Sequence, residues 1–111
     1  MGREPENGEP TIDPATQATL RWSARAATDL ARIHRFVARD NPAAAAVLIG
    51  RIYDAAQELA RFPMRGRPGR VAGTRELVIA QTPYSIAYRR RGTVVQLLTV
   101  RHGARVWPGK L

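Results

Sequence analysis

Two apolar stripes with helical spacing, interrupted by Asp40-Asn41-Pro42, constrain most strongly how this chain can fold. The apolar residues recur every three or four positions: Ala26, Leu30, Ile33 and Val37, then Leu48, Ile52, Ala55, Leu59 and Phe62. This spacing predicts two amphipathic helices, one from Ser23 to about Arg39 and one from Pro42 to about Phe62. Ser23 and Asn41 are suited to cap the two helices, and proline fits a first helical position. A connection this short predicts an antiparallel helix hairpin.

Three later segments have the alternation of strands and are predicted over residues 74–80, 84–90 and 93–101. Arg91-Gly92 predicts the tight turn between the last two. The last segment is apolar on both predicted faces, Val94, Leu98 and Val100 on one and Val95 and Leu97 on the other. A strand of this kind is predicted in the middle of a sheet. Residues 63–73 are predicted as a loop, and residues 19–22 as a further strand at a sheet edge.

The order of these elements, β-α-α-β-β-β, predicts an α+β fold. The helix hairpin would cover one face of a small antiparallel β-sheet and leave the other face free to carry function. Residues 18–111 are predicted to form a single domain. Residues 1–17 are rich in Glu, Pro and Gly without an apolar period, which predicts a disordered acidic tail.

The charge of the chain is strongly basic, at +9 over 111 residues, and Lys110 is the only lysine. Residues 1–14 carry −3, which leaves +12 on the remainder. Arginine recognises phosphate and carboxylate through two parallel hydrogen bonds and stacks on bases and aromatic rings. A basic domain of this kind is expected to meet nucleic acid, the ribosome or an acidic protein. An arginine-rich composition inherited from a GC-rich genome is the alternative explanation.

Composition also excludes several classes of protein. The chain has no cysteine, which excludes disulfides and thiolate metal sites. Its two histidines, His34 and His102, lie on different predicted elements, so neither a metal nor another cofactor is expected. No apolar run approaches the roughly 18 residues of a membrane span, and we expect a cytoplasmic protein without membrane contact. The few helical carboxylates, Asp29 among them, are expected to be solvated partners of arginine.

Candidate functional residues concentrate in the last third of the chain. Arg75, Arg101, His102 and Arg105 are the basic side chains that the predicted strands and the following tail carry, and Trp107 follows them. Because imidazole titrates near neutral pH, His102 is suited to act as a general acid or base, and the arginines are suited to hold phosphate. Structural roles are the alternatives: Arg75 as an ion-pair partner of Glu76, and the Arg89-Arg90-Arg91 run as a solvated hairpin tip.

Short motifs give the chain a family resemblance over about residues 20–108. Gly66-Arg67-Pro68-Gly69-Arg70, the segment Gly73-Thr74-Arg75-Glu76-Leu77-Val78, Tyr84-Ser85-Ile86-Ala87-Tyr88 and the end from His102 to Pro108 resemble toxins of the RelE/ParE superfamily, most closely the ParE branch. The resemblance implies a type II toxin–antitoxin system in which a ParD-like antitoxin wraps the toxin. For the ParE branch it implies inhibition of DNA gyrase and a block of replication, with plasmid stabilisation as an associated role.

The target of such a toxin stays open at this point. As a ParE-like binding inhibitor, the chain would use Arg75, Arg89, Arg101, His102, Arg105 and Trp107. As a RelE-like, metal-independent mRNA endoribonuclease acting on the ribosome, it would use His102, Arg75 and Arg105. Ser85 stands where RelE-type enzymes commonly carry an arginine, which favours the ParE-like role. A non-toxic basic nucleic-acid-binding module is the third alternative.

Overall fold

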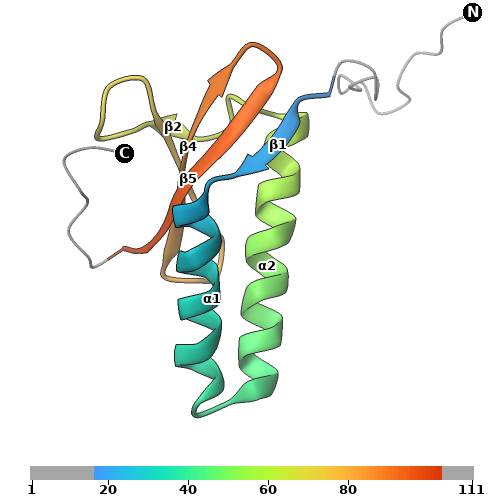
Figure 1. Cartoon of the computed structure of the whole chain (residues 1–111), viewed down its shortest axis with the longest axis vertical. Coiled ribbons are helices and arrows are strands. Elements are labelled where there is room, and N and C mark those ends of the chain that lie inside the picture. The colour runs from blue at the N-terminus through green and yellow to red at the C-terminus, as the bar shows by residue number, and fades with distance from the viewer. Residues whose placement is uncertain (1–16, 104–111) are drawn as a thin grey trace, which may run out of the picture.

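The computed structural model describes residues 17–103 and has an α+β fold, in which two antiparallel helices lie beside a single five-stranded sheet (Figure 1). The strand order is β1-β5-β4-β3-β2. The predicted tail over residues 1–17 lies almost entirely outside the described residues. Neither helix in the described range is long and apolar enough to cross a membrane.

The helix hairpin forms as predicted from its capping residues. Helix α1 spans Ala24–Ala38, and its N-cap Ser23 accepts a hydrogen bond from the backbone N–H of Ala26 at 2.9 Å. Helix α2 spans Pro42–Arg61, and its N-cap Asn41 accepts from Ala44 at 3.0 Å. Both helices end one residue before the predicted boundary.

The strands also follow the prediction, with two corrections. They span β1 Thr19–Trp22, β3 Arg75–Val78, β4 Tyr84–Arg91 and β5 Val94–His102. Strand β1 is at the sheet edge, but it runs parallel to β5, so the sheet is mixed rather than antiparallel. The alternation of apolar residues does not depend on the direction of a strand, so it could not predict the parallel pairing. The two helices that follow β1 are part of a connection long enough for β1 and β5 to run parallel. Inside the predicted loop, Arg67–Pro68 forms a short strand β2 that pairs with β3.

Strand β5 lies between β1 and β4, which confirms its predicted central position. Its predicted split into two apolar faces is wrong. Tyr88 pairs with Leu97 and Ala87 with Thr99, so the register skips Leu98. This bulge lets Val95, Leu97 and Val100 all join the core, although their spacing breaks strict alternation.

The core lies between the helix hairpin and one face of the sheet. Its largest fully buried side chains include Ile52 and Leu59 from α2, Ile86 and Tyr88 from β4, and Leu97 from β5. In an antiparallel pair, directly opposed residues point to the same face. Among the residues of β4 and β5 that alternate with the core positions, the paired Arg89 and Gln96 face away from the helices, whereas Arg101, which pairs with Ser85, lies at the end of β5 beside α1.

Candidate functional site

A groove of about 530 Å³ opens where α1 meets the ends of β4 and β5. It is lined by Asp29, Arg32, Ile33 and Phe36 from the helix and by Tyr84, Val100, Arg101 and His102 from the sheet. Two of the predicted site residues, Arg101 and His102, thus lie together with two cationic or aromatic helical side chains that the sequence analysis did not select. A second depression of about 540 Å³ also combines a histidine, an arginine and an exposed aromatic ring, at His34, Arg35 and Tyr53, but none of the predicted site residues lines it.

His102 is held at the end of β5 by the sheet register. It pairs directly with Tyr84, and the two rings meet edge to face with centroids 5.3 Å apart. The next residue, Gly103, donates its backbone N–H to the carbonyl of Pro83 at 2.6 Å, which continues the pairing past the strand end. The imidazole is only half-buried, so it keeps one side toward the groove.

Asp29 forms the inner wall of the groove and is not the solvated arginine partner that we expected. Its carboxylate accepts hydrogen bonds from the hydroxyl of Thr99 and from the backbone N–H of Val100, the latter at 3.0 Å. Ser23 donates its hydroxyl to the carbonyl of Leu98 at 2.9 Å. Strand β1 ends at Trp22, opposite Leu97. Beyond this point the side chains of Ser23 and Asp29, in place of a neighbouring strand, form hydrogen bonds with β5. They fix α1, and with it the helical wall of the groove, against the sheet.

The helical wall carries the residues that the sequence analysis missed. Phe36 is 68% exposed, and Arg32 lies one helical turn before it. Arg32, Arg35 and Arg39 surround Phe36 in a second, shallow depression that continues the groove along α1. The available signal was the position of Phe36, an aromatic residue outside the apolar stripe of its helix. An exposed aromatic side chain surrounded by arginines is typical of a binding surface.

Arg75 lies outside the groove. It is on β3, opposite Tyr88, and donates its guanidinium N–H to the carbonyl of Gly66. The alternative role of Arg75, an ion pair with Glu76, is not formed, because neighbours along a strand point to opposite faces. Arg89 lies farther along the sheet, where it donates to Gln96 at 3.2 Å. Arg105 and Trp107, the remaining predicted site residues, lie outside the described residues.

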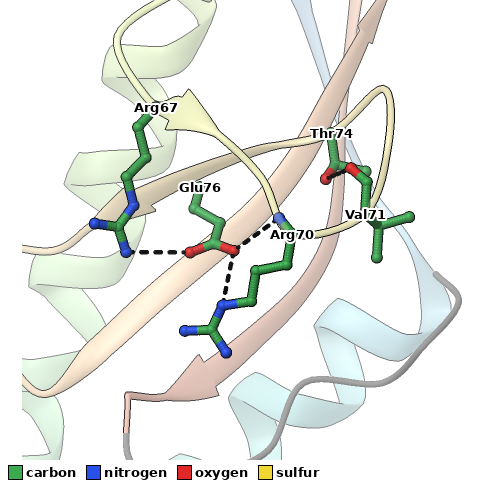
Figure 2. A network of polar contacts seen from close by, with 5 residues as sticks. All are labelled: Arg67, Arg70, Val71, Thr74 and Glu76. Atoms are coloured by element: carbon green, nitrogen blue, oxygen red, sulfur yellow. Dashed lines mark hydrogen bonds and ion pairs between the residues drawn. The ribbon is translucent and has the colours of Figure 1, made fainter.

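Glu76 instead organises the segment before β3, as Figure 2 shows. Its buried carboxylate contacts Arg67 at 3.3 Å and Arg70 at 3.4 Å, and it accepts from the backbone N–H of Arg70 at 3.2 Å. Thr74 donates its hydroxyl to Val71 and closes the turn that follows. These contacts explain why the arginine-rich segment forms strand β2 and an ordered turn rather than an open loop.

The buried hydroxyl of Tyr88 also holds the segment before β3 in place. It accepts from the N–H of Gly66 and donates to the carbonyl of Pro63, both at 2.8 Å. Burial raises the pKa of the Tyr88 phenol above its usual value, so the hydroxyl remains a proton donor at neutral pH. The backbone of Gly66 lies so close that an added Cβ would come within 2.7 Å of both the Tyr88 hydroxyl and the carbonyl oxygen of Glu76.

Substitution of Gly66 by alanine is expected to destabilise the fold by about 1–3 kcal/mol, because the new methyl group overlaps buried backbone. Gly50→Ala is the control, and the opposite effect on stability is expected for it. Gly50 lies inside α2, and an added Cβ meets nothing within 4 Å. Gly50→Ala is expected to stabilise the protein by about 0.5–1 kcal/mol. Urea unfolding of both variants measures the difference, and equal unfolding midpoints would contradict the close approach at Gly66.

The described residues contain no group of three or more His, Cys, Asp or Glu side chains arranged to hold a metal ion. The groove offers instead a half-buried imidazole, guanidinium groups and one exposed phenyl ring. Such groups bind anionic or aromatic surfaces, and an imidazole can also transfer protons.

Comparison with known proteins places this architecture in a family. Residues 20–107 match the family model described as the ParE toxin of the type II toxin–antitoxin system parDE. The chain is 45% identical over 89 residues to the "Putative toxin Y4kP" of Sinorhizobium fredii, covering 80% of this chain and 92% of that protein. It is 37% identical over 89 residues to Toxin RelE2 of Caulobacter vibrioides, covering 80% of this chain and 99% of that protein.

Two solved structures share the fold. The chromosomal ParDE toxin–antitoxin system of P. aeruginosa contains a chain with a TM-score of 0.72 and 28% identity, which covers 78% of this chain and 97% of that one. The toxin–antitoxin complex RelBE2 of Mycobacterium tuberculosis contains one with a TM-score of 0.54 and 26% identity, covering 78% and 98%. With the family match over most of its length, the chain belongs to the ParE toxins of type II toxin–antitoxin systems, within the RelE/ParE superfamily.

Proposed function

We propose that this toxin inhibits DNA gyrase and blocks replication, and that it does so by binding rather than by catalysis. The observation that carries the proposal is the exposed Phe36, surrounded by Arg32, Arg35 and Arg39 and continuous with the groove at His102. An exposed aromatic anchor with a cationic rim suits a protein or protein–DNA target. The resemblance to the ParDE toxin, with the higher TM-score of the two structural relatives, supports the same branch.

The contact surface that we propose combines the two walls of the groove. Phe36 and Arg32 supply the helical side, and Arg101 and His102 the sheet side. Arg89, on the open face of the sheet, is a further proposed contact. Arg75 would act indirectly, because its bond to Gly66 orders the segment that carries Arg65, Arg67 and Arg70. Arg105 and Trp107 remain proposed contacts.

Gyrase supercoiling of relaxed plasmid, scored for supercoiled, relaxed and cleaved DNA, tests this function. The purified toxin is expected to reduce supercoiling and to increase cleaved DNA. Phe36→Ala is expected to weaken inhibition by about tenfold or more, as loss of a central aromatic anchor does. Val47→Ala is the matched control, since Val47 is an exposed apolar residue of α2, 58% exposed, that does not line the groove. Full gyrase activity at a large molar excess of folded toxin would reject the proposal.

A RelE-like mRNA endoribonuclease is the second candidate, and one observation favours it. The register pairs Arg101 with Ser85, so a guanidinium stands beside the position where the serine replaces the family arginine. Arg101 and the adjacent His102 would then supply phosphate binding and proton transfer, and Ser85 by itself would not prevent cleavage. One relative is itself named Toxin RelE2.

The proposed partner under either function is a cognate, ParD-like antitoxin. Both structural relatives come from toxin–antitoxin systems or complexes. Co-expression with the product of the neighbouring gene is expected to give a stable complex and to restore growth that the toxin alone slows. Growth inhibition that persists beside an abundant, folded neighbouring product would show that this product is not the antitoxin.

A further inference from the structure

A second cationic surface lies on the open face of the sheet, at the hairpin end and away from the groove. Arg21 on β1 and Arg89 on β4 both pair with Gln96 of the intervening strand β5. Arg91 lies two residues beyond Arg89 and pairs with Val94. Leu20 and Trp22, on either side of Arg21, pack against the core, so Arg21 points the opposite way. We call Arg21, Arg89 and Arg91 the arginine row.

The arginine row has no acidic neighbour to neutralise it within residues 17–103. The ion pairs of this part of the chain involve Arg65, Arg67 and Arg70, which lie elsewhere. Arg21 and Arg91 are exposed, and Arg89 is half-buried against Gln96. The carboxylate on the same face, Glu76, is buried and already contacts two arginines. The row therefore presents uncompensated positive charge.

The composition of this surface favours a nucleic-acid backbone over a protein partner. Protein interfaces are anchored by buried aromatic or apolar residues, and the row offers only the half-buried Val94 between its arginines. Two strand spacings, about 9.5 Å, separate Arg21 from Arg89, and about 7 Å separates Arg89 from Arg91. DNA carries one negative charge per roughly 1.7 Å of duplex, so distances of this order reach several phosphates.

The same composition favours duplex over single-stranded nucleic acid. Single strands are held by aromatic side chains on which the bases stack. Among the described residues the exposed aromatic groups lie on the helices, at Phe36 and Tyr53, and the aromatic neighbours of the row, Trp22 and Tyr88, point to the core. We propose that the arginine row binds the phosphate backbone of double-stranded DNA without reading its sequence. This goes beyond gyrase inhibition and holds or fails independently of it.

The arginine row is also separated from the groove by a distance along strand β4. Arg89 lies four residues beyond Ser85, the partner of Arg101, which corresponds to about 13 Å along an extended strand. A toxin whose groove meets one partner therefore keeps at least Arg21 and Arg91 of the row free for a second. Bound to a DNA-handling target, such a toxin would also contact the DNA itself.

Fluorescence anisotropy of a short labelled duplex with the purified full-length chain tests this proposal in the absence of any gyrase. Affinity is expected to fall with salt between about 50 and 200 mM, with a log–log slope near −0.9 for each phosphate contact. The double variant Arg21→Gln/Arg91→Gln is expected to bind at least about tenfold more weakly and to reduce the slope by about 1.8. Arg51→Gln/Arg61→Gln, which removes the same charge from exposed positions of α2 outside both the groove and the arginines around Phe36, is the matched control.

Three results would overturn the proposal: no binding of the wild-type chain at low salt, equal losses in the two double variants, or tighter binding of a single strand that depends on the same arginines. Circular dichroism of both variants establishes that they fold. Because all four substitutions replace exposed side chains, folding should be retained. Gyrase inhibition is measured separately, so a toxin that poisons gyrase without binding duplex DNA would reject the row and leave the proposed function intact.

Discussion

Asp29→Ala is expected to lower the free energy of unfolding by about 2–5 kcal/mol. The Asp29 carboxylate is the acceptor for the hydroxyl of Thr99, which is fully buried, and for the N–H of Val100, which is 3% exposed. Alanine leaves both donors buried without that acceptor, and each such loss costs roughly 1–3 kcal/mol. A domain of this size is stable by only about 5–15 kcal/mol, so the change removes a large share of its stability.

The control for Asp29→Ala is Asp54→Ala. Asp54 is an exposed aspartate in the middle of α2, so its replacement changes the same charge and helix propensity without opening a buried bond. Asp29→Asn keeps one acceptor oxygen and is expected to fall between the two alanine variants. Urea unfolding at constant pH measures all three. If Asp29→Ala unfolds at the same urea concentration as Asp54→Ala, the carboxylate does not tie α1 to β5.

The helices and their boundaries were the part of the fold that the sequence specifies locally. Ser23 and Asn41 cap the helices through contacts three residues away, and Pro42 begins α2 as expected. Capping depends on neighbours along the chain, so residue type and spacing suffice to predict it. The central position of β5 was also predicted correctly from its apolar residues at successive positions, although the bulge at Leu98, and not two covered faces, accounts for that pattern.

The errors concern properties that depend on residues far apart in the chain. The direction of β1 is set by its pairing with β5, 75 residues later at Thr19 and Val94. The bulge at Leu98 exists only relative to β4, and strand β2 forms around a carboxylate, Glu76, that approaches from β3. None of these partners can be read from local periodicity, since alternation describes a strand but not its neighbour.

For the candidate site, too, the sequence predicted what depends on neighbouring residues and missed what depends on contacts between distant ones. Arg101 and His102 are adjacent in sequence at a strand end, and the sequence alone indicated both. Arg75 was included because it is a basic residue on a predicted strand, but its guanidinium faces Gly66 rather than the groove. Phe36 and Arg32 were missed because the groove is formed by the docking of α1 against β5, through Asp29 and Ser23. That docking is a tertiary contact between residues about 70 positions apart.

His102→Ala is the substitution that separates the two candidate targets most widely. In an endoribonuclease that uses His102 for proton transfer, the variant is expected to cleave ribosome-bound mRNA about 100-fold more slowly or worse, because general acid–base catalysis contributes roughly 10²–10⁴. In a gyrase inhibitor the same imidazole is one contact among several on the groove surface. Its removal is then expected to weaken inhibition only a few-fold.

Two measurements on the same preparations make this comparison: mRNA cleavage on purified ribosomes and gyrase supercoiling. His34→Ala is the control, because His34 is an exposed histidine of α1 that does not line the groove with His102. Truncation of His102 also removes its edge-to-face contact with Tyr84, worth about 0.5–1.5 kcal/mol, so unfolding curves must accompany the activities. A folded His102→Ala toxin that still inhibits gyrase within a few-fold of the wild type supports binding as the mechanism. Loss of inhibition by 100-fold in a folded variant would contradict the assignment of His102 as one contact among several, and would make it either a dominant binding residue or a proton-transfer group.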